Sequence, residues 1–360
     1  MADIISIATS VPDHCHKQSD ILHFMQDIYS LDDADKRKLK FLYDHSGIDT
    51  RYSVIADYGS TAHRSFIPEQ KDAAFPSLEQ RMKIFDKEAL SISVKAIGRC
   101  LHDIITPQQI THLITVSCTG MSAPGLDLAL MEEMKLPPDI FRTSVNFMGC
   151  YAAIHALKLA KMICDSEVDA KVVLVCTELC TLHFQKEFTE DNAASSLLFA
   201  DGCAAVLVSN NIQHANALSL RGFYSHVEQK GKSDMAWQLS SKGFLMTLSS
   251  YVPQLIQEDI NRLVEAAAKH NHVSVQDITH WCIHPGGKRI LDMIQKQLQL
   301  CDGSLAYSRD VLSRYGNMSS PTVLFVLKEM MDQRNSEPAK ILGMAFGPGL
   351  TMETFIAESK

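Results

Sequence analysis

An α/β fold built from two similar halves is predicted for this chain by three observations. A five-residue pattern recurs, since Gln108-x-Ile-Thr-His112 returns 168 positions later (276 − 108) as Gln276-x-Ile-Thr-His280. Each copy follows a helix-like stretch and opens a short apolar strand that runs into a loop of small residues. With 360 residues and 46% hydrophobic content, the chain is long enough for two packed units, because single cores rarely grow past about 250–300 residues.

The elements repeat in one order, which is helix, strand, helix and strand. They are expected at residues 88–103, 113–116, 151–163 and 170–175 in the first half, and at 256–271, 281–283, 321–331 and 339–344 in the second. Strands that alternate with helices of this length form parallel βα units. We therefore predict two units, residues 1–210 and 211–360, with the boundary near Asn210-Asn211.

The composition excludes several classes of protein. The net charge of -8 and the scattered basic residues argue against nucleic acid as the main partner. The N-terminus lacks the cationic start and the long apolar run of a signal peptide. No stretch approaches the roughly 18 apolar residues of a membrane span. We therefore expect a cytoplasmic protein without a membrane span.

The ten cysteines do not form a pattern typical of disulfides or metal sites. There is no CxxC pair, and Cys176 and Cys180 lack the second pair of ligands that a zinc site requires. Most cysteines are therefore interpreted as buried free thiols in a reducing compartment. We expect no metal site, and we ask whether one cysteine differs from the rest.

The loops that follow the repeated strands indicate a candidate site. In duplicated α/β halves, the ends of the central strands and helices face each other, and ligands bind in the loops there. These loops contain Cys118, Cys150, His284 and Asn317. Cys150 and Asn317 lie at nearly corresponding points, just before equivalent helices of the two halves. We therefore expect the four side chains to converge.

Cys150 is the candidate nucleophile. It stands at the start of an amphipathic helix, where the macrodipole and unpaired backbone N–H groups lower the pKa of a thiol. A nearby imidazole would lower that pKa further by forming an ion pair. Gly149 permits a close backbone approach or an unusual turn just before the thiol.

His284 and Asn317 are the candidate groups that bind a carbonyl oxygen. His284 follows a strand directly, and Gly286 and Gly287 leave space beside its ring. Asn317 precedes Pro321, which suits a first helical turn. The two side chains together suit an oxyanion hole, in which losing one donor typically costs about 100- to 1000-fold in rate. Taken singly, each residue also has an ordinary structural explanation as a packed thiol, a hydrogen-bonded histidine or a turn.

Five short signatures contain these residues, and with them the chain resembles the type III polyketide synthases, the chalcone-synthase-like branch of the thiolase superfamily. In the family's order they are Gly149-Cys150, Leu198-Phe-Ala-Asp-Gly202, Ile283-His-Pro-Gly-Gly287, Tyr315-Gly-Asn-Met-Ser-Ser320 and Phe346-Gly-Pro-Gly349. The resemblance extends over nearly the whole chain. It implies a thiolase fold of five layers in the order αβαβα, a homodimer, and a catalytic triad of Cys150, His284 and Asn317.

The resemblance also implies a reaction. Cys150 would accept an acyl group from an acyl-CoA, and His284 and Asn317 would bind the thioester carbonyl of malonyl-CoA while it loses carbon dioxide. The carbanion formed would extend the Cys150-bound acyl group by two carbons, and the chain would then cyclise to a resorcinol, a pyrone or a related phenolic. Coenzyme A thioesters are substrates in this reaction, which needs no metal or redox cofactor.

The substrate cavity implied by the resemblance is lined by Phe199, Trp237, Met246, Cys118, Cys180, His183 and Ser319. Phe199 matches the family's gatekeeper aromatic residue. Met246 replaces a second phenylalanine of the plant enzymes, and Trp237 replaces a glycine, as in bacterial alkylpyrone-type relatives. Cys118, Cys180 and His183 stand where the plant enzymes have threonines. A bulky Trp237 beside a flexible Met246 favours an aliphatic acyl starter and an alkylresorcinol or alkylpyrone product.

The coenzyme A contacts of the family are only partly retained. Lys38 matches one of the family's three basic residues that bind the phosphates of coenzyme A. The resemblance implies that Gly286 and Gly287 also contact coenzyme A. The other two basic positions hold Phe41 and His45.

Three alternatives stay open from the sequence. A β-ketoacyl synthase III of fatty acid synthesis has the same fold and triad, but it would need a basic patch for a carrier protein. A papain-like hydrolase also orders Cys, His and Asn along the chain, although the pattern around Cys150 differs. A non-catalytic binding protein with this fold is the third.

Overall fold

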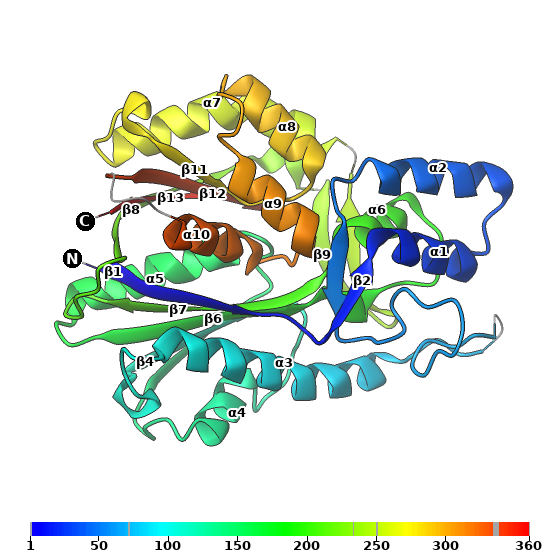
Figure 1. Ribbon diagram of the computed structural model, residues 1–360, viewed down its shortest axis with the longest axis horizontal. Helices are drawn as coiled ribbons and strands as arrows, with labels where there is room; N and C mark the ends of the chain where they lie inside the picture. The colour runs from blue at the N-terminus through cyan, green and yellow to red at the C-terminus, as the bar shows by residue number, and fades with distance from the viewer. Residues whose placement is uncertain (1, 71–72, 233, 250, 334–337, 360) are drawn as a thin grey trace.

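Five layers make up the computed structural model of the chain, which describes residues 2–70, 73–232, 234–249, 251–333 and 338–359. Two sheet layers enclose α5 (Ala152–Ser166) and α10 (Thr322–Asp332), as Figure 1 shows. Helices α3 (Leu78–Leu101) and α4 (Leu126–Glu133) cover the outer face of one sheet layer. Helices α7 (Val252–His270) and α8 (Lys288–Gln297) cover the outer face of the other. The αβαβα order predicted from the resemblance is confirmed.

The first sheet layer belongs to the first half of the chain. Its strands, in spatial order, are β1 (Asp3–Ser10), β7 (Asp201–Ser209), β6 (Lys171–Leu179), β4 (His112–Ser117) and β5 (Phe141–Asn146). The first two pairs are antiparallel, and β6, β4 and β5 run parallel to one another.

The second sheet layer repeats this pattern. Its strands, in spatial order, are β8 (Leu218–Val227), β13 (Thr351–Ser359), β12 (Lys340–Gly347) and β11 (His280–Ile283). Here too the first two pairs are antiparallel and the last pair is parallel. A short pairing of β1 with β8 joins the two layers into one sheet of nine strands. The predicted repeat is therefore present in strand order and direction.

Smaller elements complete the fold around the ends of the central strands. They are β2 (His14–Lys17), α1 (Gln18–Tyr29), α2 (Asp33–Asp44), β3 (Thr50–Ser53), α6 (Glu190–Leu198), β9 (Met235–Ser240), β10 (Gly243–Leu248) and α9 (Ala306–Tyr315). Figure 1 places α1, α2, α6 and β9 together at one end of the molecule. None of the helices in the described ranges is long and apolar enough to cross a membrane.

Two helices begin earlier than the sequence pattern predicts. Helix α3 begins at Leu78 and not at residue 88, because Ser77 and Gln80 form a capping box that satisfies the first backbone N–H groups. Helix α7 begins at Val252 and not at residue 256, with Pro253 in its first turn, where a proline needs no hydrogen-bond partner. Pro321, expected in a first turn, is the N-cap of α10.

The core lies on both sides of each sheet layer. One cluster of buried apolar side chains surrounds α5 and α10 between the sheets, and two further clusters lie under the outer helices. Every residue of β7 is buried, because helices cover both of its faces. The two middle helices are consequently fixed, and the loops before them have defined positions.

Close packing between β12 and β13 gives a test of this core. Phe355 pairs with Gly343 across the two strands, and a Cβ on Gly343 would lie 1.9 Å from the Phe355 ring. We expect Gly343→Ala to lower the free energy of unfolding by about 1–3 kcal/mol through overpacking. Gly98→Ala is the matched control, because no atom lies within 4 Å of its added Cβ on α3, and it should raise stability by about 0.5–1 kcal/mol. Urea unfolding measures the free energy of unfolding of both variants. Equal values for the two would contradict the close packing of Gly343 against Phe355.

Candidate functional site

A single pocket collects the loops that the sequence indicated. It contains about 1070 Å³ of space, part of it open to solvent. The predicted site residues that line it are Cys118, Cys150, Cys180, His183, Phe199, Trp237, Met246, His284, Gly286, Asn317 and Ser319. The lining is mostly apolar, so the pocket suits a substrate with an apolar part.

Cys150 lies at the start of the middle layer, two residues before α5 begins. Gly149 before it has φ +84°, and a Cβ there would lie 2.4 Å from the Pro348 ring. Glycine is therefore required both by the left-handed backbone and by the approach of the Phe346-Gly-Pro-Gly349 loop. That loop thus packs directly behind the turn that presents the thiol.

His284 follows β11 and is 1% exposed. Its backbone N–H donates to the carbonyl of Met344 at 2.9 Å, which continues the parallel pairing of β11 with β12. Neither ring nitrogen has a hydrogen-bond partner in the part of the chain that the structure describes. Burial lowers the pKa of His284 to about 3, so the imidazole is neutral near pH 7. A buried imidazole without partners in a pocket is available to a ligand.

Asn317 is oriented by its own loop. Its Oδ1 accepts the backbone N–H of Ser319 at 2.8 Å, so the amide nitrogen is left as the free donor. Its Nδ2 lies 3.5 Å from the carbonyl of Gly286, which is long for a hydrogen bond. Thr322 fixes the same loop, since its hydroxyl accepts from Met318 N–H and donates to the carbonyl of Ser319.

A backbone bridge connects Asn317 to Phe199, which lines the pocket. The N–H of Asn317 donates to the carbonyl of Leu198, and the N–H of Ala200 donates to the carbonyl of Asn317, both at 2.9 Å. Beneath the bridge, a Cβ on Gly202 would lie 2.3 Å from Met318 Sδ. The Leu198–Gly202 and Tyr315–Ser320 signatures therefore exist as one packed unit.

Arg51 of β3 holds the same unit from the other side. Its side chain is fully buried, its Nη1 donates to the carbonyl of Phe199 at 2.7 Å, and its Nε donates to Gln18 at 2.9 Å. The nearby carboxylate of Asp201 balances its charge. Burial raises the pKa of Asp201 to about 6. Arg51 was not predicted as part of the site, because nothing in the sequence around it distinguishes it from a surface arginine.

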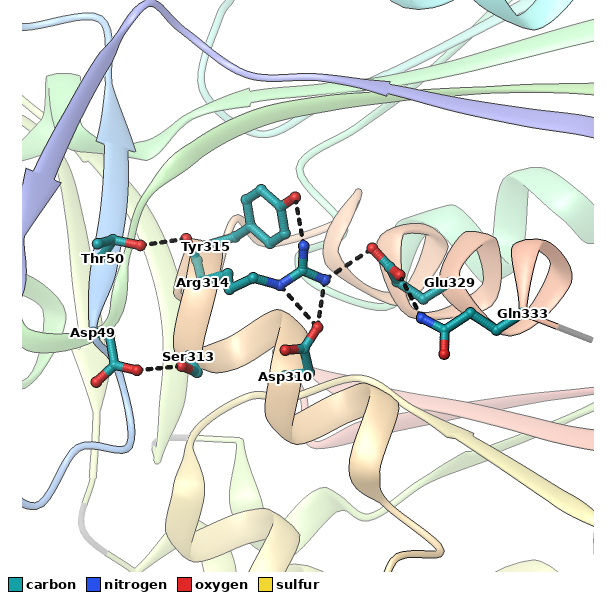
Figure 2. Close-up of polar contacts among 8 residues, drawn as sticks. All are labelled: Asp49, Thr50, Asp310, Ser313, Arg314, Tyr315, Glu329 and Gln333. Atoms are coloured by element: carbon teal, nitrogen blue, oxygen red, sulfur yellow. Dashed lines mark hydrogen bonds and ion pairs between the residues drawn. The ribbon is translucent and has the colours of Figure 1, made fainter.

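Polar contacts around α9 also fix the loop of Asn317 (Figure 2). Arg314 donates to Glu329 of α10 at 2.9 Å and to Asp310 at 2.8 Å, so the helices on either side of the loop are joined. Thr50 donates to the carbonyl of Arg314, and Ser313 donates to Asp49, which attaches the end of α9 to the start of β3.

The thiol of Cys150 differs from the sequence expectation. Burial raises its pKa to about 11, although contacts with Ser319 and Asn317 partly offset this, and the neighbouring Glu178 adds to the rise. The expected lowering of this pKa by the helix terminus is therefore wrong, because desolvation outweighs it. The distance from Cys150 Sγ to Ser319 Oγ is 3.6 Å. Cys150 and His284 are both neutral near pH 7.

Glu178 is a buried acidic residue near Cys150. It was not predicted from the sequence. It is fully buried, and it accepts hydrogen bonds from Cys118 N–H at 2.9 Å and from Ser320 Oγ at 2.7 Å. Burial raises its pKa to about 7. The sequence does contain one signal of this site, which is a single acidic residue near the end of the apolar strand β6. Its charge is positioned to oppose a thiolate on Cys150.

The β9–β10 hairpin forms an apolar wall of the pocket. Side chains alternate along strands, so Trp237 and Met246, which pair directly across the hairpin, face the pocket together with Phe244. Phe244, missed from the sequence, stacks on Trp237 with ring centroids 5.8 Å apart. Trp237 also donates its indole N–H to the carbonyl of Cys118 at 2.8 Å. Its ring is therefore held in one position against the loop near the nucleophile.

His183 is a buried, neutral part of the same wall. Its Nε2 donates to the carbonyl of Thr119 at 3.1 Å, and its ring makes edge-to-face contacts with Phe244 and Trp237. Burial lowers the pKa of His183 to about 3. Cys180 and Ser319 line the pocket nearby, as the resemblance implied.

Two predicted residues do not line the pocket. Lys38 is exposed on α2 and forms a 3.6 Å ion pair with Glu190, while Gly287 packs against Leu198 at the N-cap of α8. Phe41 and His45, which replace the other basic positions, stack on each other on the surface of α2 with centroids 4.2 Å apart.

One group of side chains outside the pocket has the spacing of a metal site. Ligand atoms of His226, Glu228 and Asp259 lie within 4.8 Å of one another. Asp259 already forms an ion pair with Arg262 at 2.6 Å, so a cation there would compete with the guanidinium. None of the three lines the pocket.

Comparisons with known proteins agree with this geometry. Residues 1–211 match the family model for the N-terminal domain of chalcone and stilbene synthases, and residues 225–360 match the C-terminal domain. The chain is 30% identical to the alpha-pyrone synthesis polyketide synthase-like Pks18 of Mycobacterium tuberculosis, over 98% of this chain and 90% of that protein.

Two solved structures have a closely similar fold. The crystal structure of PKS-I from the brown alga Ectocarpus siliculosus superposes with a TM-score of 0.90 at 26% identity, over 99% of this chain and 98% of that one. The C-terminal type III polyketide synthase domain of Steely1, a type I/III hybrid from Dictyostelium, gives the same TM-score and identity over 99% of both chains.

The raised thiol pKa predicts a characteristic pH dependence of alkylation. Only the thiolate reacts, so the rate of iodoacetamide labelling at Cys150 should still be rising between pH 9 and 10. Peptide mass spectrometry separates Cys150 from the exposed thiol of Cys301, which serves as the internal reference. A plateau at Cys150 below pH 8 would instead mean that the empty pocket already holds a thiolate.

Proposed function

Because the chain belongs to the chalcone and stilbene synthase family and is a type III polyketide synthase, we propose that Cys150, His284 and Asn317 are its catalytic groups. The observation that carries this assignment is their position in one pocket, contributed by both halves of the chain. A type III polyketide synthase condenses acyl groups with loss of carbon dioxide, and its family membership argues against the protease and fatty acid synthesis alternatives.

Loading of the starter begins with a proton transfer from Cys150 to His284. In a pocket where both groups are neutral, this transfer creates a thiolate and an imidazolium with no net charge added to the pocket. Their mutual attraction offsets part of the burial penalty that each charge would have alone. The thiolate attacks the acyl-CoA carbonyl carbon, the bond to the coenzyme A sulfur breaks, and the leaving thiolate takes the proton from His284.

Extension uses His284 and Asn317 as donors. Each presents an N–H to the thioester oxygen of malonyl-CoA, which becomes negative when the carboxylate leaves as carbon dioxide and its electron pair stays on the adjacent carbon. That carbon attacks the acyl group, a carbon–carbon bond forms, and Cys150 leaves as the thiolate. The bond from Asn317 Oδ1 to Ser319 supports this role, because it directs the amide donor away from its own loop.

The apolar hairpin supports an aliphatic acyl starter. Trp237, Phe244 and Met246 narrow the pocket with flat and flexible apolar surfaces, and the indole N–H of Trp237 is already used by the carbonyl of Cys118. Such a wall suits a hydrocarbon chain that needs no polar partner. The product would be an alkylpyrone, an alkylresorcinol or a related phenolic.

A homodimer is the proposed assembly. Strand β5 lies at the edge of the nine-stranded sheet, with most of its side chains exposed and Phe141 68% exposed. An unpaired edge strand with an apolar side chain is a ready partner for a second copy. Met121 and Leu128, both exposed, come from the segment just before β5 and suit the same contact.

The test of the reaction is product mass spectrometry on purified protein given malonyl-CoA and a panel of acyl-CoA starters. We expect products heavier than the starter by whole ketide units, with medium and long aliphatic starters used best. Cys150→Ala should form none of these products, since it lacks the nucleophile. Extension by the Cys150→Ala variant, or no product from any starter with folded wild-type protein, would refute the assignment.

Trp237 should limit the size of the starter. We expect Trp237→Gly to remove both the ring and its contact with Phe244, so that bulkier starters or longer products appear in the same assay. Trp237→Phe is the matched control, because it keeps an aromatic ring against Phe244 and should retain most of the parent's product range. An unchanged product range in Trp237→Gly would show that this side chain does not set the cavity.

A further inference from the structure

The pocket wall reaches the protein surface at the start of α8, beside two exposed cations. Gly286 and Ile290 line the pocket, and between them Lys288 and Arg289 are exposed. Neither cation forms an ion pair or a side-chain hydrogen bond with any of the described residues. We infer that Lys288 and Arg289 bind the phosphate groups of coenzyme A thioesters, an inference that rests on the proposed function.

Lys288 extends toward the end of α2. A Cβ on Gly47, in the turn after that helix, would lie 3.3 Å from Lys288 Cδ, so the lysine side chain follows this turn. The α2 helix also contacts α6, where Tyr43 donates to the carbonyl of Ser196 at 3.0 Å. Ser196 lines the pocket. The ends of α2, α6 and α8 therefore meet around the pocket, and Lys288 lies where they meet.

The surface of α2 itself offers few cations there. Phe41 and His45 stack on each other, and His45 Nδ1 lies 2.8 Å from the carbonyl of Phe41. Lys38 is paired with Glu190, whose carboxylate would repel a phosphate. Lys40 is paired with Asp44 at 2.5 Å. The two other cations of α2, Lys36 and Arg37, lie near its first turn, away from the turn at Gly47. A diphosphate near the C-terminal end of this helix therefore needs positive charge from another element, and α8 supplies it.

The buried end of the pocket independently indicates a ligand. His284 is 1% exposed and has two unpartnered ring nitrogens, and it lies only four residues before Lys288. A thioester carbonyl at His284 would place the remainder of the coenzyme A molecule along the α8 wall toward the surface. The backbone N–H groups in the first turn of α8, a helix of ten residues, add a favourable field for an anion there.

The experiment compares ligands with and without phosphates. Isothermal titration calorimetry of coenzyme A and of pantetheine, which lacks the nucleotide and its phosphates, is run on the wild type and on the double variant Lys288→Gln/Arg289→Gln. We expect the Kd for coenzyme A to rise about tenfold or more in the variant, which corresponds to about 1.4 kcal/mol. The Kd for pantetheine should not change.

Lys269→Gln/Lys296→Gln is the matched control. It removes two exposed cations from the same outer layer, one of them at the far end of α8, and it changes the net charge equally. The affinity of this control for coenzyme A should stay within about twofold of the wild type, because exposed charges beyond a Debye length of about 10 Å are largely screened at 0.1 M salt. An equal loss of affinity in the two double variants would overturn the inference, since it would reflect net charge alone.

Kinetics separate this site from the proposed reaction. In the Lys288→Gln/Arg289→Gln variant, KM for malonyl-CoA should rise about tenfold while KM for the malonyl thioester of N-acetylcysteamine, which has no phosphate, stays unchanged. An unchanged Kd for coenzyme A, or an equal rise in KM for both thioesters, would refute the phosphate site. If the wild type binds coenzyme A through these residues but condenses neither thioester, the proposed reaction fails and the binding site stands.

Discussion

The backbone bridge between Phe199 and Asn317 is the contact on which the pocket depends. These residues belong to different halves of the chain, and two hydrogen bonds of 2.9 Å fix their separation. Arg51 adds a third attachment through the carbonyl of Phe199, from a segment before either of them. Since the fold places His284 and Cys150 at the ends of rigid elements, this bridge sets where the amide and the gatekeeper ring lie relative to them. A shift of about 1 Å in such a geometry can cost about a hundredfold in rate.

Burial gives the pocket a second property, which is that Cys150 and His284 are both neutral near pH 7. The thiol pKa is raised and the imidazole pKa is lowered by the same cause, the exclusion of water. Glu178 adds a carboxyl group whose charge would oppose a thiolate. Burial of this kind slows alkylation and oxidation of the thiol, because only the thiolate reacts readily. In the loading step that we propose, the ion pair forms only as the thiolate is consumed by the acyl group.

The sequence predicted the architecture and the main site because both depend on order along the chain. The repeat of Gln-x-Ile-Thr-His indicated two equivalent strands, β4 and β11, and Cys118 and His284 lie directly after them. The prediction that Asn317 also follows a strand is wrong, because it lies between helices α9 and α10. The burial of the site residues could not be predicted from the sequence in the same way. The pKa of Cys150 depends on how many atoms exclude water from it, and Phe244 and Arg51 enter the site only through contacts between distant segments. Helix starts were also displaced, as at Ser77, where a cap extends α3 beyond its apolar pattern.

The duplicated halves show how equivalent loops acquire different tasks. The loop after β11 presents His284 to the pocket, whereas the loop after β4 presents Cys118, whose sulfur accepts the backbone N–H of Gly149 at 3.1 Å. One loop therefore supplies a side chain that we propose takes part in the reaction, and the other supports the backbone next to Cys150. Replacing Cys118 with a larger residue would move Gly149, which Pro348 already confines from the other side. The loop after β4 is thus constrained by packing, while the loop after β11 is constrained by the position of His284 in the pocket.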